Sequence, residues 1–305
     1  MLAEAEMLSI ATAANTTAGR VIDCGVKTAG GLSAGLRMAE VCTAGLATVH
    51  ATAAPMVLDS GPAISIHTDQ PVAACMASQY AGWQIAPEGY FAMGSGPMRA
   101  AAAREELFDK IDYRERPQSV VGVLETGQLP DDTVIEYIAE KCGVQAAGVA
   151  LLVAPTASIA GTVQIVARSV ETALHKLFDL GFDLRRVRSG WGIAPLPPVA
   201  ADDLTAIGRT NDAILYGGQV VLWVEADDDE LRRVGPQVPS VASSDHGRPF
   251  REIFERHNRD FYKIDPKLFS PAEITLVNLA SGRSWQFGRL EPDVLRESFD
   301  TTAET

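Results

Sequence analysis

The residues best suited to chemistry in this sequence lie in a stretch of helical character, "ARSVETALHKL", at positions 167–177. Arg168 and Glu171 are three residues apart, so on a helix their side chains are near neighbours. A carboxylate beside a guanidinium can be held ionised or tuned as a general base, depending on whether pairing or burial dominates. The same spacing also fits an ordinary surface ion pair, worth roughly 0.3–0.5 kcal/mol. Spacing alone leaves both interpretations open.

The surrounding pattern predicts one long amphipathic helix over residues 163–180. At about 100° per residue, its apolar side chains fall on one face. Gln164, Arg168, Glu171 and His175 then form a polar flank within an arc of about 60° beside that face. We therefore expect a narrow polar column next to the core.

The segment "APTASIAGT" (154–162), which comes before this helix, offers hydroxyl and backbone groups for a ligand. It is small, contains glycine and carries Thr156 and Ser158. A loop of this kind at a helix start lets a ligand approach unpaired backbone N–H groups. We expect Thr156 and Ser158 to contribute to binding.

A second turn, "GSGP" at 94–97, has two competing interpretations. Gly94 and Gly96 permit unusual backbone angles, Ser95 can accept from helix amides, and Pro97 suits a first helical turn. The turn is therefore either a well-capped helix start or a cradle for an anion or polar ring. It lacks the phosphate-loop signature, so no nucleoside triphosphate site is predicted.

A third segment, 67–85, combines small residues with Gln79, Tyr80 and Trp83. An aromatic side chain beside glycine and glutamine can form the floor of a site for a flat heterocycle. The same residues are equally suited to a protein core.

Composition excludes several classes of function. The 305 residues contain 39 Asp and Glu against 26 Lys and Arg, for a net charge of −13 and no basic run. Nucleic acids and anionic membranes need a basic face, so we predict neither as a partner. The four cysteines show no C-x-x-C spacing and the five histidines no ligand spacing, which predicts buried free thiols and no bound metal. No secretory signal and no apolar run of about 18 residues is present, which predicts a cytoplasmic protein.

The chain must position these residues on alternating strands and helices. Asp131 and Gly143 are the predicted N-cap and stop of a helix. We expect further helices near 33–46 and 292–299, and strands at 20–26, 63–67, 119–125, 148–155, 219–226, 273–278 and 284–288. This order predicts a mixed α/β fold with mixed sheets. The Gly- and Pro-rich segment 189–203 is the predicted break or functional loop.

Taken together, several long motifs resemble the methenyltetrahydromethanopterin cyclohydrolase family. They span most of the chain and include "TDQPVAAC" (68–75), "SQYAGWQI" (78–85), "YFAMGSGPMRA" (90–100), "VAPTASIAGTVQI" (153–165), "RSVETALHKLFDLGFD" (168–183), "GRTNDAILYGG" (208–218) and "DFYKIDPKLFSPAEI" (260–274). The resemblance implies reversible hydrolysis of the methenyl bridge of tetrahydromethanopterin, or its dephospho form, to the 5-formyl compound. The one-carbon carrier is then the substrate, and no cofactor is required.

The resemblance also implies how the residues and the domains are used. Glu171 would activate water and Arg168 would orient it, while Gly94, Ser95, Gly96, Gln79, Tyr80, Thr156, Ser158 and Gln164 would bind the pterin. Two α/β domains would hold the pterin in a cleft between them, with 1–87 plus 194–305 in the first and 88–193 in the second. The protein would be a cytoplasmic homotrimer acting in formaldehyde oxidation in methylotrophy. A folate-type methenyl cyclohydrolase and a non-catalytic pterin-binding subunit remain the alternatives.

Overall fold

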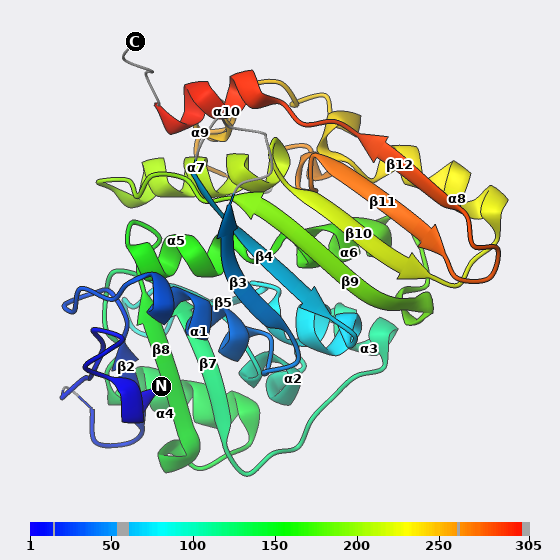
Figure 1. Cartoon of the computed structure of the whole chain (residues 1–305). Coiled ribbons are helices and arrows are strands. Elements are labelled where there is room, and N and C mark those ends of the chain that lie inside the picture. The colour runs from blue at the N-terminus through cyan, green and yellow to red at the C-terminus, as the bar shows by residue number, and fades with distance from the viewer. Residues whose placement is uncertain (15, 54–60, 261–262, 301–305) are drawn as a thin grey trace. The chain divides into compact units, whose positions relative to one another are not determined.

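A computed structural model describes residues 1–14, 16–53, 61–260 and 263–300. Contacts divide the chain into two compact units (Figure 1). Unit 1 comprises residues 1–47 and 73–165, and unit 2 comprises 48–72 and 166–305. Each unit has its own six-stranded sheet, and the strands of both sheets can be traced in Figure 1.

Unit 1 is built on a six-stranded sheet whose three neighbouring strands β2, β8 and β7 are parallel. The other strand pairs of this sheet are antiparallel. In sheet order, the strands are β1 (Ala11–Thr12), β2 (Arg20–Asp23), β8 (Val149–Ala154), β7 (Val120–Glu125), β6 (Ala92–Ser95) and β5 (Trp83–Ile85). The runs "VVGVLE" and "VALLVA" are apolar almost throughout because β7 and β8 are covered on both faces.

Alternate residues of these strands enter two different cores. Val21, Leu124 and Val153 pack with α4 (Asp132–Cys142) on one face. Their neighbours Ile22, Val123 and Leu152 pack with α1 (Leu32–Cys42) and α5 (Ile159–Val166) on the other. The unit also contains α2 (Met98–Ala102), α3 (Glu106–Ile111) and most of the π-helical segment Val72–Gln79.

Unit 2 is built on a second six-stranded sheet, in which β10 and β11 are parallel and the other neighbours are antiparallel. In sheet order, the strands are β12 (Ser284–Gly288), β11 (Glu273–Asn278), β10 (Gln219–Val224), β9 (Val187–Pro195), β4 (Pro62–Thr68) and β3 (Thr48–Ala53). Its helices are α6 (Ser169–Asp179), α7 (Asp203–Leu215), α8 (Asp228–Val234), α9 (Phe250–Arg256) and α10 (Pro292–Phe299). Helix α6 packs on β9, β10 and β4, and α7 packs with α9 and α10.

The mixed α/β class and mixed sheets predicted from the sequence are confirmed, as is the capping of α4. The Asp131 carboxylate accepts the N–H of Val134 at 3.2 Å, and Gly143 ends the helix in the left-handed conformation with φ 68°. The prediction of one helix over 163–180 is wrong. Helix α5 ends at Val166, residues 167–168 form a turn, and α6 begins at Ser169.

The chain also divides differently from the boundaries expected above. Because β2 pairs with β8 and β8 with β7, residues 1–47 belong to the same unit as 73–165. The expected break at 189–203 begins inside β9, which pairs with both β4 and β10 and is therefore a central strand of unit 2. Its glycines make room for α6 instead of marking a loop.

Candidate active site

The predicted acid–base pair stands at the start of α6 in unit 2. Arg168 is the N-cap residue, and its carbonyl oxygen accepts the N–H of Thr172 at 3.0 Å. Glu171 is the third residue of the first turn, where the positive end of the helix dipole favours a negative charge. Arg168 is 7% exposed and Glu171 is 5% exposed. Arg168 and Glu171 are therefore not an exposed surface ion pair, because both side chains are almost fully withdrawn from water.

Close packing against β9 fixes the position of this helix start. A Cβ on Gly190 would lie 2.7 Å from Cγ1 of Val170, and one on Gly192 would collide with the hydroxyl of Ser169. Only glycines at these two positions let the first turn of α6 lie directly on the strand. The backbone that carries Glu171 is therefore held by the core of unit 2.

The polar column expected on one helix is divided by the turn at 167–168. Gln164, 1% exposed, lies on α5 and belongs to unit 1, whereas Arg168 and Glu171 belong to unit 2. His175 is half-buried on α6 and lies 3.6 Å from the Asp179 carboxylate, one turn further along. That carboxylate is an ordinary i,i+4 partner of the imidazole on its own helix.

Unit 1 brings two of the predicted binding segments together. The N–H of Gly96 donates to the carbonyl of Ser78 at 2.8 Å. The Ser78 hydroxyl donates to the Cys42 carbonyl at 2.7 Å, and the Cys42 thiol lies 3.2 Å from the Ser95 hydroxyl. The turn after β6 is thus joined through α1 to the segment that carries Gln79.

The turn itself is a strand end, not a capped helix start. Ser95 is the last residue of β6, and α2 has Pro97 as its N-cap with no side-chain hydrogen bond. Gly96 has φ +93°, which favours glycine, and a Cβ on Gly94 would lie 2.7 Å from Cδ1 of Ile85. Of the two interpretations of this turn, the capped helix start is wrong, because the Ser95 hydroxyl contacts the Cys42 thiol and Pro97 is the N-cap residue of α2.

Gln79 and Tyr80 follow the same segment. Gln79 is fully buried at the end of the π-helix, and Tyr80 is half-buried. The guanidinium of Arg99 lies over the Tyr80 ring, 4.9 Å from its centroid. This cation–π contact fixes the plane of the phenol ring in a part of unit 1 close to Gly96.

Thr156 and Ser158 use their hydroxyls to hold the turn between β8 and α5. The Ser158 hydroxyl donates to the Pro155 carbonyl at 2.8 Å and accepts the N–H of Gly161 at 3.0 Å. The Thr156 hydroxyl donates to the carboxylate of Glu125 at the end of β7. Both residues are buried, and they lie at the carboxyl ends of parallel strands, where open α/β sheets bind ligands.

Two carboxylates at the same sheet edge were missed by the sequence reasoning. One is Glu125, and the other is Asp23 at the end of β2. Burial would raise the pKa of Asp23, but N–H groups of residues 25–28 and the Thr28 hydroxyl donate to it and lower the pKa below its usual value. The available signal was an acidic residue directly after an apolar strand, as in "RVID" and "VVGVLE".

The four cysteines are buried free thiols, as predicted. Burial raises the pKa of Cys24 and that of Cys142 to about 12. Within the described residues, no group of three or more His, Cys, Asp and Glu side chains is arranged to hold a metal ion. No helix in that part of the chain has the length and apolar character needed to cross a membrane.

The two mixed sheets place the chain in the α/β class, and Arg168 and Glu171 are both buried at the start of α6. The sequence profile of the family described as "Cyclohydrolase (MCH)" matches residues 1–299. Several similar proteins carry the name methenyltetrahydromethanopterin cyclohydrolase. The protein from Rhodopirellula baltica is 50% identical over 288 residues, covering 92% of this chain and 86% of the relative.

Two further relatives carry the same name. The protein from Methylobacterium sp. is 46% identical over 303 residues, covering 98% of this chain and 94% of the relative. The protein from Methanosarcina barkeri is 45% identical over 282 residues, covering 92% and 88%. The chain therefore belongs to the cyclohydrolase family.

Proposed function

We propose that this protein reversibly hydrolyses 5,10-methenyl-tetrahydromethanopterin, or its dephospho form, to the 5-formyl compound. The observation that carries the proposal is the identity of 44–50% to proteins named for this activity, which extends over at least 92% of the chain. The deep burial of Glu171 and Arg168 supports the catalytic part of the proposal.

The chemistry explains why a buried carboxylate is needed. The methenyl carbon lies between two nitrogens and shares a positive charge with them, so it is an electrophile. A water oxygen forms a bond to this carbon, and Glu171 accepts the proton that the water loses. The proton then passes to the ring nitrogen that leaves as its C–N bond breaks, giving the formyl product. A carboxylate in this place also favours the approaching cation.

Arg168 acts through Glu171 in this proposal. Its guanidinium orients the carboxylate and keeps it in the ionised form that can accept a proton. Both residues belong to the start of one helix whose backbone is fixed by contact with β9. A rigid support of this kind is what general-base catalysis requires, because a small displacement of the base lowers the rate strongly.

The pterin is bound by the groups of unit 1 described above and by Gln164. Ser95, Gly96, Gln79 and Tyr80 come from segments that hydrogen bonds join around Cys42 and Ser78. Gly94 supplies backbone beside them, and Thr156 and Ser158 contribute the turn at the carboxyl end of β8. A half-buried phenol held flat by Arg99 is suited to contact a heterocycle.

Replacement of Glu171 by Gln tests the mechanism. Loss of the methenyl absorbance is followed with tetrahydromethanopterin and folate substrates. We expect kcat to fall by about 10²–10⁴-fold in Glu171→Gln. The matched control is Glu136→Gln at an exposed position of α4, which should leave kcat unchanged. Normal turnover in Glu171→Gln would remove this residue from the mechanism.

The same assay separates the rival functions. A preference for folate would favour a folate-type methenyl cyclohydrolase, and binding without turnover would favour a non-catalytic pterin-binding subunit. We further propose that the protein is a cytoplasmic homotrimer acting in formaldehyde oxidation in methylotrophy, and that it needs no metal or redox cofactor. Light scattering tests the trimer, and full activity after dialysis against a chelator tests the last point.

A further inference from the structure

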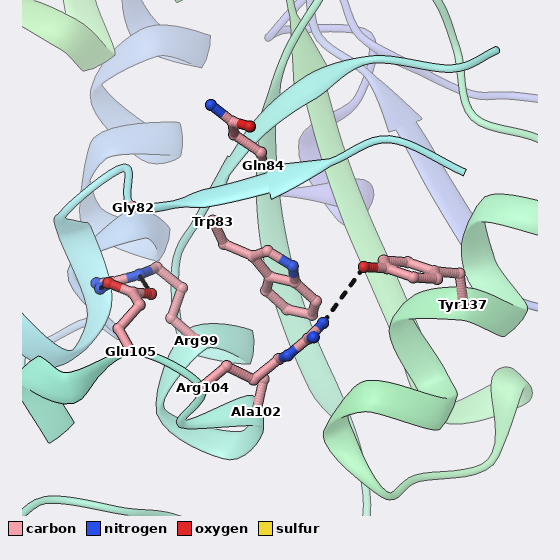
Figure 2. A pocket seen from close by; sticks show the side chains of 8 residues that line it. All are labelled: Gly82, Trp83, Gln84, Arg99, Ala102, Arg104, Glu105 and Tyr137. Carbon is pink, nitrogen blue, oxygen red and sulfur yellow. Dashed lines mark hydrogen bonds and ion pairs between the residues drawn. The ribbon is translucent and has the colours of Figure 1, made fainter. Parts of the chain in front are cut away.

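Unit 1 contains a cavity that none of the proposed pterin-binding or catalytic residues lines. Its volume is about 310 Å³, and it lies among β5, the α2–α3 region and α4 (Figure 2). It is lined by Gly82, Trp83, Gln84, Arg99, Ala102, Arg104, Glu105 and Tyr137. One ordered water needs only roughly 10–15 Å³, and small-molecule sites begin at roughly 300 Å³. The cavity is therefore large enough for a small ligand.

Among the described residues, one buried hydrogen-bond donor at this cavity has no acceptor. Trp83 is 7% exposed, and its indole Nε1 is buried without a hydrogen-bond acceptor among the described residues. Figure 2 shows this nitrogen on the side of the indole that faces Tyr137, whose ring centroid is 6.4 Å from that of Trp83. Because an unsatisfied buried N–H destabilises a protein, each such group in a native fold calls for an explanation.

Two further donors reach the same space. The Arg104 guanidinium donates to the Tyr137 phenol oxygen at 3.3 Å and is directed toward the same side of the indole (Figure 2). The phenol oxygen is the acceptor in this bond, so the phenol proton remains able to donate to a ligand. Indole, guanidinium and phenol thus present donors to the cavity.

The charges around the cavity favour an anion. Arg99 is matched by Glu105, with nitrogen–oxygen distances of 2.5 and 3.1 Å, and also donates to the Met76 carbonyl. Among the described residues, by contrast, no carboxylate forms a salt bridge with Arg104. On α4 beside Tyr137, the Glu140 carboxylate pairs with Lys141 at 2.6 Å, and the nearby charge of Arg104 also lowers its pKa. The three basic side chains here still outnumber the two carboxylates, Glu105 and Glu140, by one.

The positive charge of Arg104 is therefore in excess locally, although the whole chain carries −13. From these donors and charges, we propose that the cavity is a binding site for a small oxyanion of the carboxylate or phosphate class. One oxygen accepts from the indole N–H of Trp83, and the others accept from the Arg104 guanidinium and the Tyr137 hydroxyl. Charge-assisted bonds from a guanidinium to such oxygens are the strongest of these contacts. The rings of Trp83 and Tyr137 form the less polar walls.

The indole N–H signals in a ¹H–¹⁵N NMR spectrum of the full chain report on this site directly. The protein has four tryptophans, and the signal absent in Trp83→Phe identifies Trp83. Inorganic phosphate and succinate are titrated separately against sodium chloride at equal ionic strength. We expect a saturable shift of the Trp83 signal with phosphate or succinate but not with chloride. The probe that binds more tightly identifies the phosphate or the carboxylate class as the source of the ligand.

Charge removal provides the second arm. Arg104→Gln alters an exposed residue and should weaken binding by about tenfold or more, as loss of a charge-assisted bond implies. Arg37→Gln, an equal change at an exposed residue of α1 that pairs with Glu40, should not alter binding. The proposal is overturned by an unshifted Trp83 signal, by an equal shift with chloride, or by undiminished binding in Arg104→Gln. Turnover is measured separately, so failure here leaves the cyclohydrolase proposal to its own test.

Discussion

The buried carboxyl group of Asp212 should make the stability of unit 2 depend on pH. Asp212 lies on α7 and is fully buried. It accepts the N–H of Phe250 at 2.8 Å and the hydroxyl of Ser298 at 2.6 Å. Burial raises its pKa from 3.8 to about 7, against the opposing effect of these two hydrogen bonds, and the charges of Glu297 and Glu252 add to the rise.

The sign of the effect follows from this raised pKa. Between pH 4 and pH 7 the folded state keeps the Asp212 proton, whereas the unfolded chain has lost it. The contribution of this group to the free energy of unfolding therefore falls as the pH rises through that window and is constant above it. The difference between 3.8 and about 7 corresponds to at most about 4 kcal/mol, at about 1.4 kcal/mol per pH unit.

Asp212→Asn removes the titration and keeps the shape. The new amide oxygen can still accept from Phe250, and its N–H₂ group can donate to the Ser298 oxygen. We expect the free energy of unfolding of the variant to exceed that of the wild type by about 2 kcal/mol at pH 5 and by about 4 kcal/mol at pH 8. Urea unfolding of both proteins at each pH, followed by circular dichroism, measures the difference.

The control for this measurement is Asp293→Asn, an exposed acid that pairs with Arg296 on the surface of α10. Its stability difference from the wild type should vary by less than about 1 kcal/mol over the same range. If the difference between Asp212→Asn and the wild type is the same at pH 5 and pH 8, the carboxyl group does not titrate in this window. Burial then does not raise the pKa of Asp212 into this window.

Two structural substitutions test the packing of unit 1. A Cβ on Gly35 would lie 2.6 Å from Cβ of Val163, so Gly35→Ala should lower the free energy of unfolding by about 1–3 kcal/mol. Val163→Gly, which removes that Cβ, added to this variant should recover part of the loss, and simple additivity of the two changes in urea unfolding would contradict the contact. Asp131→Ala removes the bond to the Val134 N–H at the start of α4 and should cost about 1 kcal/mol by the same measurement. Asp131→Asn retains an acceptor and should cost less, and an equal loss would mean that the hydrogen bond to the Val134 N–H is not what stabilises the start of α4.

The parts of the fold that the sequence predicted are those with local causes. Helix α4 has an N-cap in Asp131 and a left-handed glycine stop in Gly143, both set by chemistry within a few residues. The apolar runs of β7 and β8 are continuous because both faces of these strands are covered. Such signals do not depend on which distant segment lies next to them.

The break between α5 and α6 has no such local signal. The sequence around Ala167 and Arg168 contains neither proline nor glycine, and the apolar period continues across it. The chain turns there because α5 packs within unit 1, while α6 begins on Gly190 and Gly192 of unit 2. The competing influence is tertiary, since residues more than twenty positions later determine where the second helix starts.

The same limit explains which site residues were missed. Asp23 and Glu125 follow apolar strands about a hundred residues apart, and nothing near either one indicates the other. Their strands become neighbours of β8 only through parallel pairing, which brings their carboxyl ends to one edge with Thr156. The order of strands in the sheet follows from long-range parallel pairing. Local periodicity does not encode this pairing, because the partner strands are far apart in the sequence. An acidic residue that ends a buried strand is therefore a useful candidate before the sheet order is known, because parallel strands collect such residues at the ligand-binding edge.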